Sequence, residues 1–216
     1  MSDLVALARS PIAAADPVGE HGGWEVSVRR STAALTITDC TPLAKVAVRA
    51  PVDGAMQRAL GVPFGRAARS GDGELVVGSG PGGWLVLAPV GTAARVRSRL
   101  AATAAATGEF VSVVDLTHGR ALVRLRGGAS ADLLAKVCAV DLSDAVTPDG
   151  AAFRSSVARL VTDVVRDDVD GTRSYLLHCE RSSGQYLHDA LLDAGAEFGI
   201  DAAGFDAAGF DAAGSE

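Results

Sequence analysis

Apolar and polar residues alternate along several short segments of the chain, and this two-residue period predicts β-strands. The predicted strands are 35–38, 43–49, 74–78, 84–88, 110–115, 120–126, 156–165 and 173–180. The dipeptide Asp170-Gly171 separates the last two strands. Because a two-residue hairpin turn favours residues that tolerate a positive φ, this dipeptide predicts that the two strands form a hairpin.

Segments with helical periodicity separate these strands. A short helix is predicted at 53–60, and a longer one begins after Thr92, which can cap it, and ends at Gly108, which suits a left-handed position. A third helix can be capped by Ser130, and the last is predicted from about Ser183 to Phe198. The apolar stripe of the second helix comprises Ala93, Val96, Leu100 and Ala104.

The order of these elements predicts an α+β fold. Strands and helices occur twice as ββαββα, in halves at about 24–108 and 109–199, and such units pack helices on a mostly antiparallel sheet. Residues 1–23, rich in Ala, Pro and Gly, are predicted to form an extended arm. Residues 200–216 repeat a five-residue unit that fits neither helix nor strand, so a disordered tail is predicted, with a docked Phe as the alternative.

Composition and charge exclude several classes of function. The chain has 216 residues, 48% of them apolar, which is enough for a full core. No apolar run approaches the roughly 18 residues of a membrane span, and the first residues lack the pattern of an export signal. Without Asp201, Asp206, Asp211 and Glu216 of the tail, the net charge of −6 becomes nearly neutral. We therefore expect binding to neither nucleic acid nor membrane.

Cysteine usage indicates the compartment. Cys40, Cys138 and Cys179 lie among apolar neighbours and lack CxxC spacing, as buried thiols do. Disulfides are therefore not expected, and the sequence predicts a cytoplasmic protein.

Several short motifs suggest a cofactor or metal site, but the residues around them do not fit such a site. Residues 78–83 match GxGxxG, but a strand pattern follows them, whereas a dinucleotide site needs a helix there. The aspartates at 163–170 lack the ligand spacing and the distal Glu of a calcium loop. The histidines form no pair with the spacing of a zinc site. We expect this chain to bind no cofactor or metal by itself. Trp84 is expected to anchor the core or an interface.

The stretch 114–120 contains candidate catalytic groups. His118 could act as a general base with Asp115 orienting its ring. Alternatively, Asp115 and Thr117 bind the backbone of a turn while His118 is a satisfied interior or interface group. We favour the second interpretation, because a catalytic histidine also needs a pocket.

The segment VDLTHGRALVRLRGGASADLLAKVCAVDLSD resembles the strand, turn, strand and helix signature of the glycine-cleavage aminomethyltransferase fold. It is most similar to the branch formed by the gamma subunits of heterotetrameric sarcosine oxidase. ARSPIA, LTITDCTPLAKVAVRA, GPGGWLVLAP and YLHDALLDAGAEFG also resemble that branch, so the likeness runs from about Ala8 to Gly199.

This resemblance implies an accessory role. Heterotetrameric sarcosine oxidase oxidatively demethylates sarcosine and passes the one-carbon unit to tetrahydrofolate. The implied partners are the alpha, beta and delta subunits. FAD, FMN, NAD and tetrahydrofolate are expected in the alpha and beta subunits and zinc in the delta subunit, and the gamma subunit has no assigned catalytic residue.

Active aminomethyltransferases carry a Gly-Gly segment that leads into an Asp-Asp pair. The nearest stretch here is 156–163, which lacks the glycines and has one carboxylate, Asp163. Glycines allow a close backbone approach, and the paired carboxylate would take a proton. Asp163 is therefore a third candidate catalytic residue, besides His118 and Asp115. We nevertheless expect that none of the three is catalytic. A free-standing folate-binding aminomethyltransferase-like protein is the alternative.

Overall fold

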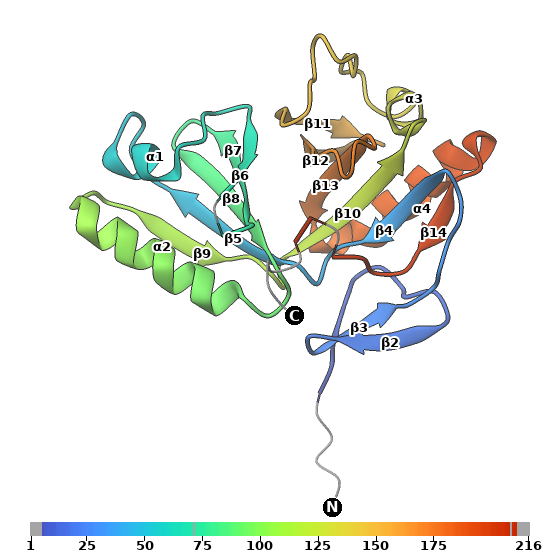
Figure 1. Cartoon of the computed structure of the whole chain (residues 1–216), viewed down its shortest axis with the longest axis horizontal. Helices are drawn as coiled ribbons and strands as arrows, with labels where there is room; N and C mark the ends of the chain where they lie inside the picture. The colour runs from blue at the N-terminus through green and yellow to red at the C-terminus, as the bar shows by residue number, and fades with distance from the viewer. Residues whose placement is uncertain (1–5, 71, 208, 211–216) are drawn as a thin grey trace, which may run out of the picture.

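The computed structural model describes residues 6–70, 72–207 and 209–210 (Figure 1). In chain order the strands are β1 (Ala8–Arg9), β2 (Val18–His21), β3 (Trp24–Ser27), β4 (Leu35–Asp39), β5 (Ala44–Arg49), β6 (Ala67–Arg69), β7 (Leu75–Gly80), β8 (Gly83–Ala88), β9 (Ser112–Asp115), β10 (Arg120–Gly127), β11 (Ala152–Val157), β12 (Leu160–Arg166), β13 (Ser174–Glu180) and β14 (Asp201–Ala203). The α-helices are α1 (Ala55–Leu60), α2 (Ala93–Thr107), α3 (Ser130–Ala135) and α4 (Gly184–Gly195). The mixed α+β class is as predicted.

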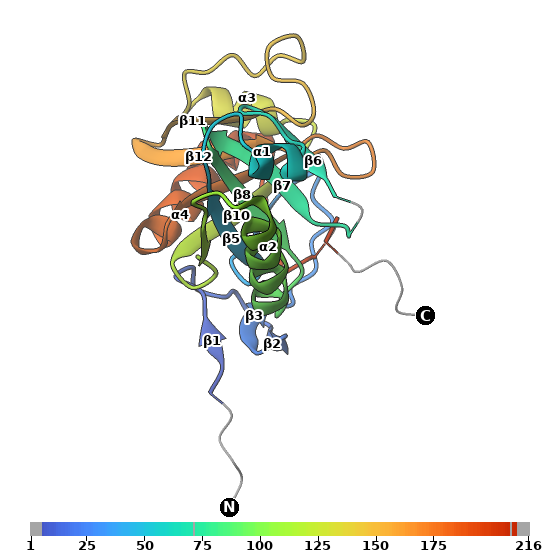
Figure 2. The same cartoon turned by 90° about the vertical axis from the view of Figure 1, so that its left-hand side faces the viewer.

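Two large sheets face each other in the middle of the molecule. One has the strand order β6-β7-β8-β5-β9 and the other β11-β12-β13-β10-β4-β14. Helices α1 and α2 pack on the outer face of the first sheet, and α3 and α4 on the outer face of the second. A third apolar cluster joins the inner faces, with Leu75 and Leu85 from one sheet and Leu122 and Leu176 from the other. Figure 1 shows these two lobes, Figure 2 shows α2 in front of β5, and α2 contacts β5 and β9.

Strand alternation explains why both faces of each sheet are apolar. In β10, Val123 and Leu125 contact the α3 and α4 side, whereas Leu122 points to the opposite sheet. Successive side chains of a strand lie on opposite faces, so a strand between two layers needs apolar residues at nearly every position. Trp84 of β8 is part of the core beneath α1 and α2, and its indole Nε1–H donates to the Val62 carbonyl at 2.8 Å.

The strand count differs from the predicted ββαββα halves. Segment 156–165 was expected to be one strand, but β11 ends at Val157 and β12 begins at Leu160. The turn residues Ala158 and Arg159 have φ of 48° and 68°. Neither residue type favours a positive φ, so the sequence carried no turn signal at this point. The short strand β6 was also not predicted.

The two sheets exchange strands across the expected boundary between the halves. β4 precedes β5 in the chain but lies in the sheet of β10, and β9 follows α2 but lies in the sheet of β5. Each connection, β4 to β5 and β9 to β10, therefore passes from one sheet to the other.

Both chain ends contain more regular structure than predicted. In the expected arm, β1 and β2 pair with β3 to form a small sheet. In the expected tail, β14 pairs in parallel with β4, and Phe210 is 1% exposed between the lobes. The repeat has no strand period, but the edge of β4 supplies backbone partners and the inter-sheet cluster supplies a site for the ring. Residues 211–216 of the predicted tail lie outside the described residues.

Several local predictions are confirmed, and two helix caps are not. Gly108 ends α2 with φ of 69°, and all three cysteines are buried and free. Thr92 occupies the N-cap position of α2, but its hydroxyl donates to the Pro89 carbonyl at 2.7 Å and makes no capping hydrogen bond. Ser130 is the first residue of α3 rather than its cap. No helix in the described parts of the chain is long and apolar enough to cross a membrane.

Candidate functional site in the row Arg154, Asp163 and His178

Three polar side chains form a row across β11, β12 and β13. Asp163 is the register partner of both Arg154 and His178. Its carboxylate accepts hydrogen bonds from Arg154 Nε at 2.6 Å and Nη2 at 3.0 Å, and it lies 3.3 Å from His178 Nδ1. Directly opposed residues in adjacent strands share a face, so register alone brings these groups together.

The row lies on the inner face of its sheet. Val165, two positions from Asp163, belongs to the inter-sheet cluster, so Asp163 also points toward the other lobe. Asp163 borders a crevice with Phe64 and Ser79, which come from that other lobe. The crevice holds only about 10 Å³, which is room for at most one water molecule. A pterin ring does not fit in this crevice.

The electrostatics make Asp163 a weak base. Burial by itself would raise the pKa of Asp163, but hydrogen bonds with His178 and Arg154 outweigh it and lower the pKa to about 2. Burial lowers the pKa of His178, and Asp163 opposes part of that shift. At neutral pH, a neutral imidazole therefore faces an ionised carboxylate, and an acid with so low a pKa has little tendency to take a proton.

His178 leaves one ring nitrogen without a partner. For a neutral ring, Nδ1–H donates to Asp163, and Nε2 is then a buried acceptor with no hydrogen bond among the described residues. Sequence reasoning missed His178. The signal was present, because the predicted turn at Asp170-Gly171 pairs Val169 with Thr172, and counting outward from that pair places Asp163 opposite His178.

The other two candidates lie elsewhere and make structural contacts. Asp115 Oδ1 accepts a hydrogen bond from the Thr117 amide at 2.8 Å, so Asp115 binds the backbone of the turn, as favoured from the sequence. His118 is exposed on one side and stacks on Trp24 with ring centroids 4.7 Å apart and an interplanar angle of 8°. No hydrogen bond or ion pair between His118 and Asp115 is present in the described parts of the chain, so they do not form a base and its orienting acid.

A buried lysine close to this turn was also missed. Lys45 is 0% exposed, and its ammonium donates to the carbonyls of Thr41 at 2.6 Å and Leu43 at 2.8 Å. Burial lowers the pKa of Lys45 to about 7, and the carboxylate of Asp39 opposes part of this shift. The sequence signal was a single lysine inside an apolar strand pattern. Since its side chain is enclosed, it stabilises the β4–β5 connection rather than offering an amine to a substrate.

A second polar cluster joins the lobes near the end of the described chain. Asp167 accepts hydrogen bonds from Arg69 at 2.9 Å and from Arg124 at 2.8 Å. The Arg69 guanidinium also lies 4.3 Å from the centroid of the Phe210 ring. Arg69 comes from the first sheet and Arg124 from the second, so this cluster connects the lobes.

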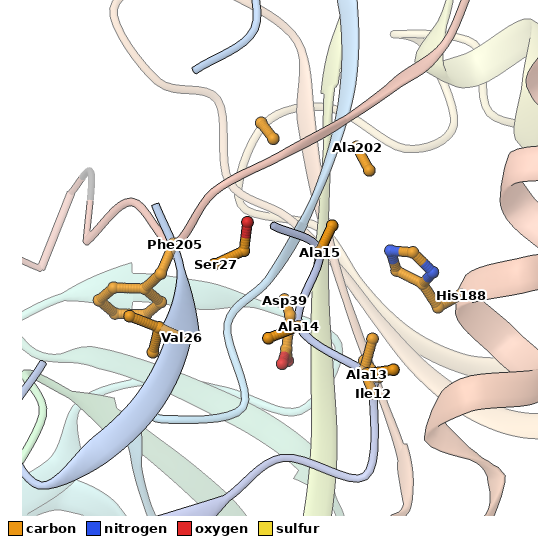
Figure 3. A pocket seen from close by; sticks show the side chains of 11 residues that line it. Ile12, Ala13, Ala14, Ala15, Val26, Ser27, Asp39, His188, Ala202 and Phe205 are labelled. Carbon is orange, nitrogen blue, oxygen red and sulfur yellow. The ribbon is translucent and has the colours of Figure 1, made fainter. Parts of the chain in front are cut away.

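Two hollows lie beside the tail. The larger, about 330 Å³, is lined by Arg124, Arg126, Asp206 and several hydroxyl groups. The smaller, about 30 Å³, lies where the arm, β3, α4 and the tail meet, and Figure 3 shows His188, Asp39 and Phe205 around it. Among the described residues that line either hollow, no nucleophile, base and orienting group are hydrogen-bonded to one another.

The metal and dinucleotide motifs weighed in the sequence have these structures. No cluster of His, Cys, Asp or Glu with a metal-binding arrangement occurs in the described residues. Residues 78–83 form the end of β7, a turn and the start of β8.

Comparisons with known proteins agree with this fold. One chain of a heterotetrameric sarcosine oxidase from Corynebacterium sp. U-96, in complex with pyrrole 2-carboxylate, superposes with a TM-score of 0.67 at 23% identity, covering 79% of this chain and 89% of that chain. Glycine cleavage system aminomethyltransferase T from Bartonella henselae superposes with a TM-score of 0.71 at 16% identity, covering 92% of this chain and 60% of that one. No curated protein sequence matches this chain significantly.

The family model of the GCVT N-terminal domain matches residues 75–210. The match begins with β7 and ends at Phe210, so it includes Asp163, His178 and residues 200–210 of the tail. It covers well over half of the chain, and the chain therefore belongs to the GCVT N-terminal domain family.

Proposed function

We propose that this protein is a non-catalytic gamma-type subunit of a cytoplasmic, heterotetrameric, flavin-dependent sarcosine oxidase. The complex would oxidatively demethylate sarcosine or a related N-methyl amine and transfer the one-carbon unit to tetrahydrofolate. FAD, FMN, NAD, tetrahydrofolate and zinc would be held by its alpha, beta and delta partners. The likeness to one chain of such an oxidase, covering 89% of that chain, motivates this proposal.

The state of Asp163 carries the proposal. It is the carboxylate nearest to the family's catalytic position, and Arg154 and His178 already occupy it. A carboxylate with a pKa of about 2 is a poor proton acceptor, and the crevice beside it is too small for a pterin. A chain whose nearest candidate group is a poor proton acceptor would contribute to an assembly through its surface.

The test uses the tagged chain recovered from its source together with the proteins bound to it. The proposal expects a stable flavoprotein complex in which the variant Asp163→Asn keeps full sarcosine turnover. Asp193→Asn, on the exposed side of α4, is the matched control. A complex that forms with Asp163→Asn but loses turnover, while the control retains it, contradicts the non-catalytic role. Failure to co-purify with a flavoprotein contradicts the subunit role.

A second candidate is a free-standing folate-binding aminomethyltransferase-like protein. Two observations favour it: the fold matches aminomethyltransferase T over 92% of this chain, and Ala158 and Arg159 have the left-handed backbone that glycines adopt easily. Titration calorimetry of the isolated chain with tetrahydrofolate separates the candidates. Saturable binding that Asp163→Asn abolishes supports the second candidate, and absence of binding supports the first.

A further inference from the structure

Strand β9 is a sheet edge whose outer side has no backbone partner among the described residues. β9 pairs with β5 alone. The Leu116 amide donates to the Lys45 carbonyl at 2.8 Å, which sets the phase of this antiparallel ladder. Because successive residues point their backbone groups to opposite sides, Val113 and Asp115 direct their N–H and C=O groups away from β5. These groups are available to another strand.

β9 has only four residues and one charged side chain, Asp115 at its end, and its other side chains do not protect this edge. Phe110, just before the strand, is 92% exposed, and Val114 is 46% exposed. Ser112 and Val114 face the same side as Phe110, since side chains repeat every second residue. Native edges are usually blocked by lysine, proline, a bulge or a covering segment, and the sequence Phe-Val-Ser-Val-Val-Asp contains no lysine or proline.

The other edges of the two large sheets meet other parts of the chain. β14 covers β4 in parallel register, with Ala202 beside Ile37. The edges of β6 and β11 approach each other, and the Ala67 amide donates to the Gly150 carbonyl at 2.7 Å while the Ala152 amide donates to the Gly65 carbonyl at 3.0 Å. β9 has no such cover.

β4 and β9 correspond to each other closely. Each is followed by a connection that crosses to the opposite sheet. Each ends at an aspartate that accepts the amide of a threonine two residues later: Asp39 with Thr41 at 2.9 Å, and Asp115 with Thr117 at 2.8 Å. β9 thus has the place in one sheet that β4 has in the other.

The two strands also present their edges in the same phase. The Cys40 amide donates to the Leu122 carbonyl at 2.9 Å, as Leu116 does to Lys45, so Ile37 directs its backbone groups outward as Val113 does. Ile37 and Val113 both pack on the helix-covered side of their sheets. At β4 these outward groups meet β14, a short extended segment of the tail (Figure 1).

We propose that β9 binds an extended segment of a partner polypeptide, which adds as a parallel strand in the position that β14 has on β4. This partner is a different chain, so the inference relies on the subunit role proposed above. Its segment places apolar side chains over Phe110 and Val114 and a small residue on the α2 side, as Ala202 does beside Ile37. A second β9, related by a two-fold axis, would instead pair antiparallel.

Hydrogen exchange on the native complex tests the proposal directly. The amides of Val113 and Asp115 should exchange quickly in the isolated chain and at least about tenfold more slowly in the purified complex, because a strand partner protects outward N–H groups. The amides of Val114 and Leu116 point toward β5 and serve as internal references. A formed complex with unchanged exchange at Val113 and Asp115 overturns this inference and leaves the subunit role intact.

A pair of charged substitutions gives the second measurement. Phe110→Lys with Val114→Lys should lower recovery of the flavoprotein partner by about tenfold or more, since buried lysines at an edge oppose strand addition. Val52→Lys with Val146→Lys is the matched control, because these valines are 58% and 57% exposed in the loops before α1 and β11. Equal recovery of both variants contradicts the proposal. So does concentration-dependent protection of β9 in the isolated chain, which indicates self-association.

Discussion

Thr41 and Thr117 make the same hydrogen bond in the two connections that cross between the sheets. The Thr117 hydroxyl accepts the Lys45 amide at 3.1 Å, and the Thr41 hydroxyl accepts the Leu122 amide at 3.1 Å. Each threonine therefore provides an acceptor for a backbone amide near the start of β5 or β10, in the sheet that the chain has just left. The two connections lie in the middle of the molecule, where β4–β5 and β9–β10 pass one another.

Replacing Thr117 with valine should destabilise the fold by about 2 kcal/mol, because the buried Lys45 amide loses its acceptor while the side-chain shape is kept. Urea unfolding at neutral pH measures the change. Thr103→Val is the control, since the Thr103 hydroxyl only bonds within α2, and it should change the free energy of unfolding by less than about 0.5 kcal/mol. Equal effects of the two substitutions would refute the role of Thr117.

Lys45 should make stability rise with pH. Its pKa is about 7 in the folded chain against 10.5 as the ordinary value, so between these pH values the unfolded state binds more protons. Raising the pH through this window therefore favours the folded state. We expect the difference in unfolding free energy between the native chain and Lys45→Met to increase in favour of the native chain from pH 7 to pH 9.5. A difference independent of pH would show that Lys45 is charged in the fold.

The row at Asp163 should contribute stability that disappears in acid. The folded pKa of about 2 lies below the ordinary 3.8, so the contribution is complete above about pH 4 and is lost as pH falls through 2. Asp163→Asn should cost about 2 kcal/mol at pH 7 and progressively less below pH 4. Asp193→Asn provides the comparison at each pH. A constant cost of Asp163→Asn down to pH 2 would rule out the ionic contribution.

The turn between β11 and β12 should be improved by glycine. Arg159 has φ of 68°, which is strained for a residue with a Cβ, so Arg159→Gly should raise the free energy of unfolding by about 1 kcal/mol. Arg97→Gly makes the same chemical change within α2 and should lower it by about 1 kcal/mol. Thermal and urea unfolding check both signs. A loss of stability in Arg159→Gly would contradict the left-handed turn.

Phe210 should hold the end of the described chain between the lobes. Its ring is 1% exposed and lies beneath Arg69, so Phe210→Ala should destabilise the fold by about 3 kcal/mol through lost burial and a cavity. Phe110→Ala removes a ring that is 92% exposed and should change stability little. Similar unfolding curves for the two variants would mean that the Phe210 ring is not docked in solution.

Local sequence signals predicted much of the secondary structure and little of the pairing. Alternation identified most strands, and Gly108 and Asp170-Gly171 identified a helix end and a hairpin, because these depend on neighbouring residues. The hairpin at Ala158-Arg159 was missed because a positive φ there is imposed by the packing of β11 and β12 and not by residue type.

The sequence identified one residue of the candidate site, Asp163, as the only carboxylate in the stretch 156–163. It did not indicate what holds Asp163, because Arg154 and His178 reach it only once the registers of two hairpins are set. A shift of one residue in either register would move the partner to the other face. Lys45 likewise reads as an ordinary strand residue until the neighbouring sheet encloses it.

By itself, the sequence determined the α+β class, the helix stripes and the buried thiols, since each follows from the period and chemistry of adjacent residues. Only the tertiary structure decided that β4 and β9 lie in the sheets of the opposite halves, that the repeat tail adds β14 and inserts Phe210, and that Asp163 is held as a carboxylate by Arg154 and His178. These features join residues far apart in the chain, and their free energy arises from packing and hydrogen bonds that exist only after both lobes have formed.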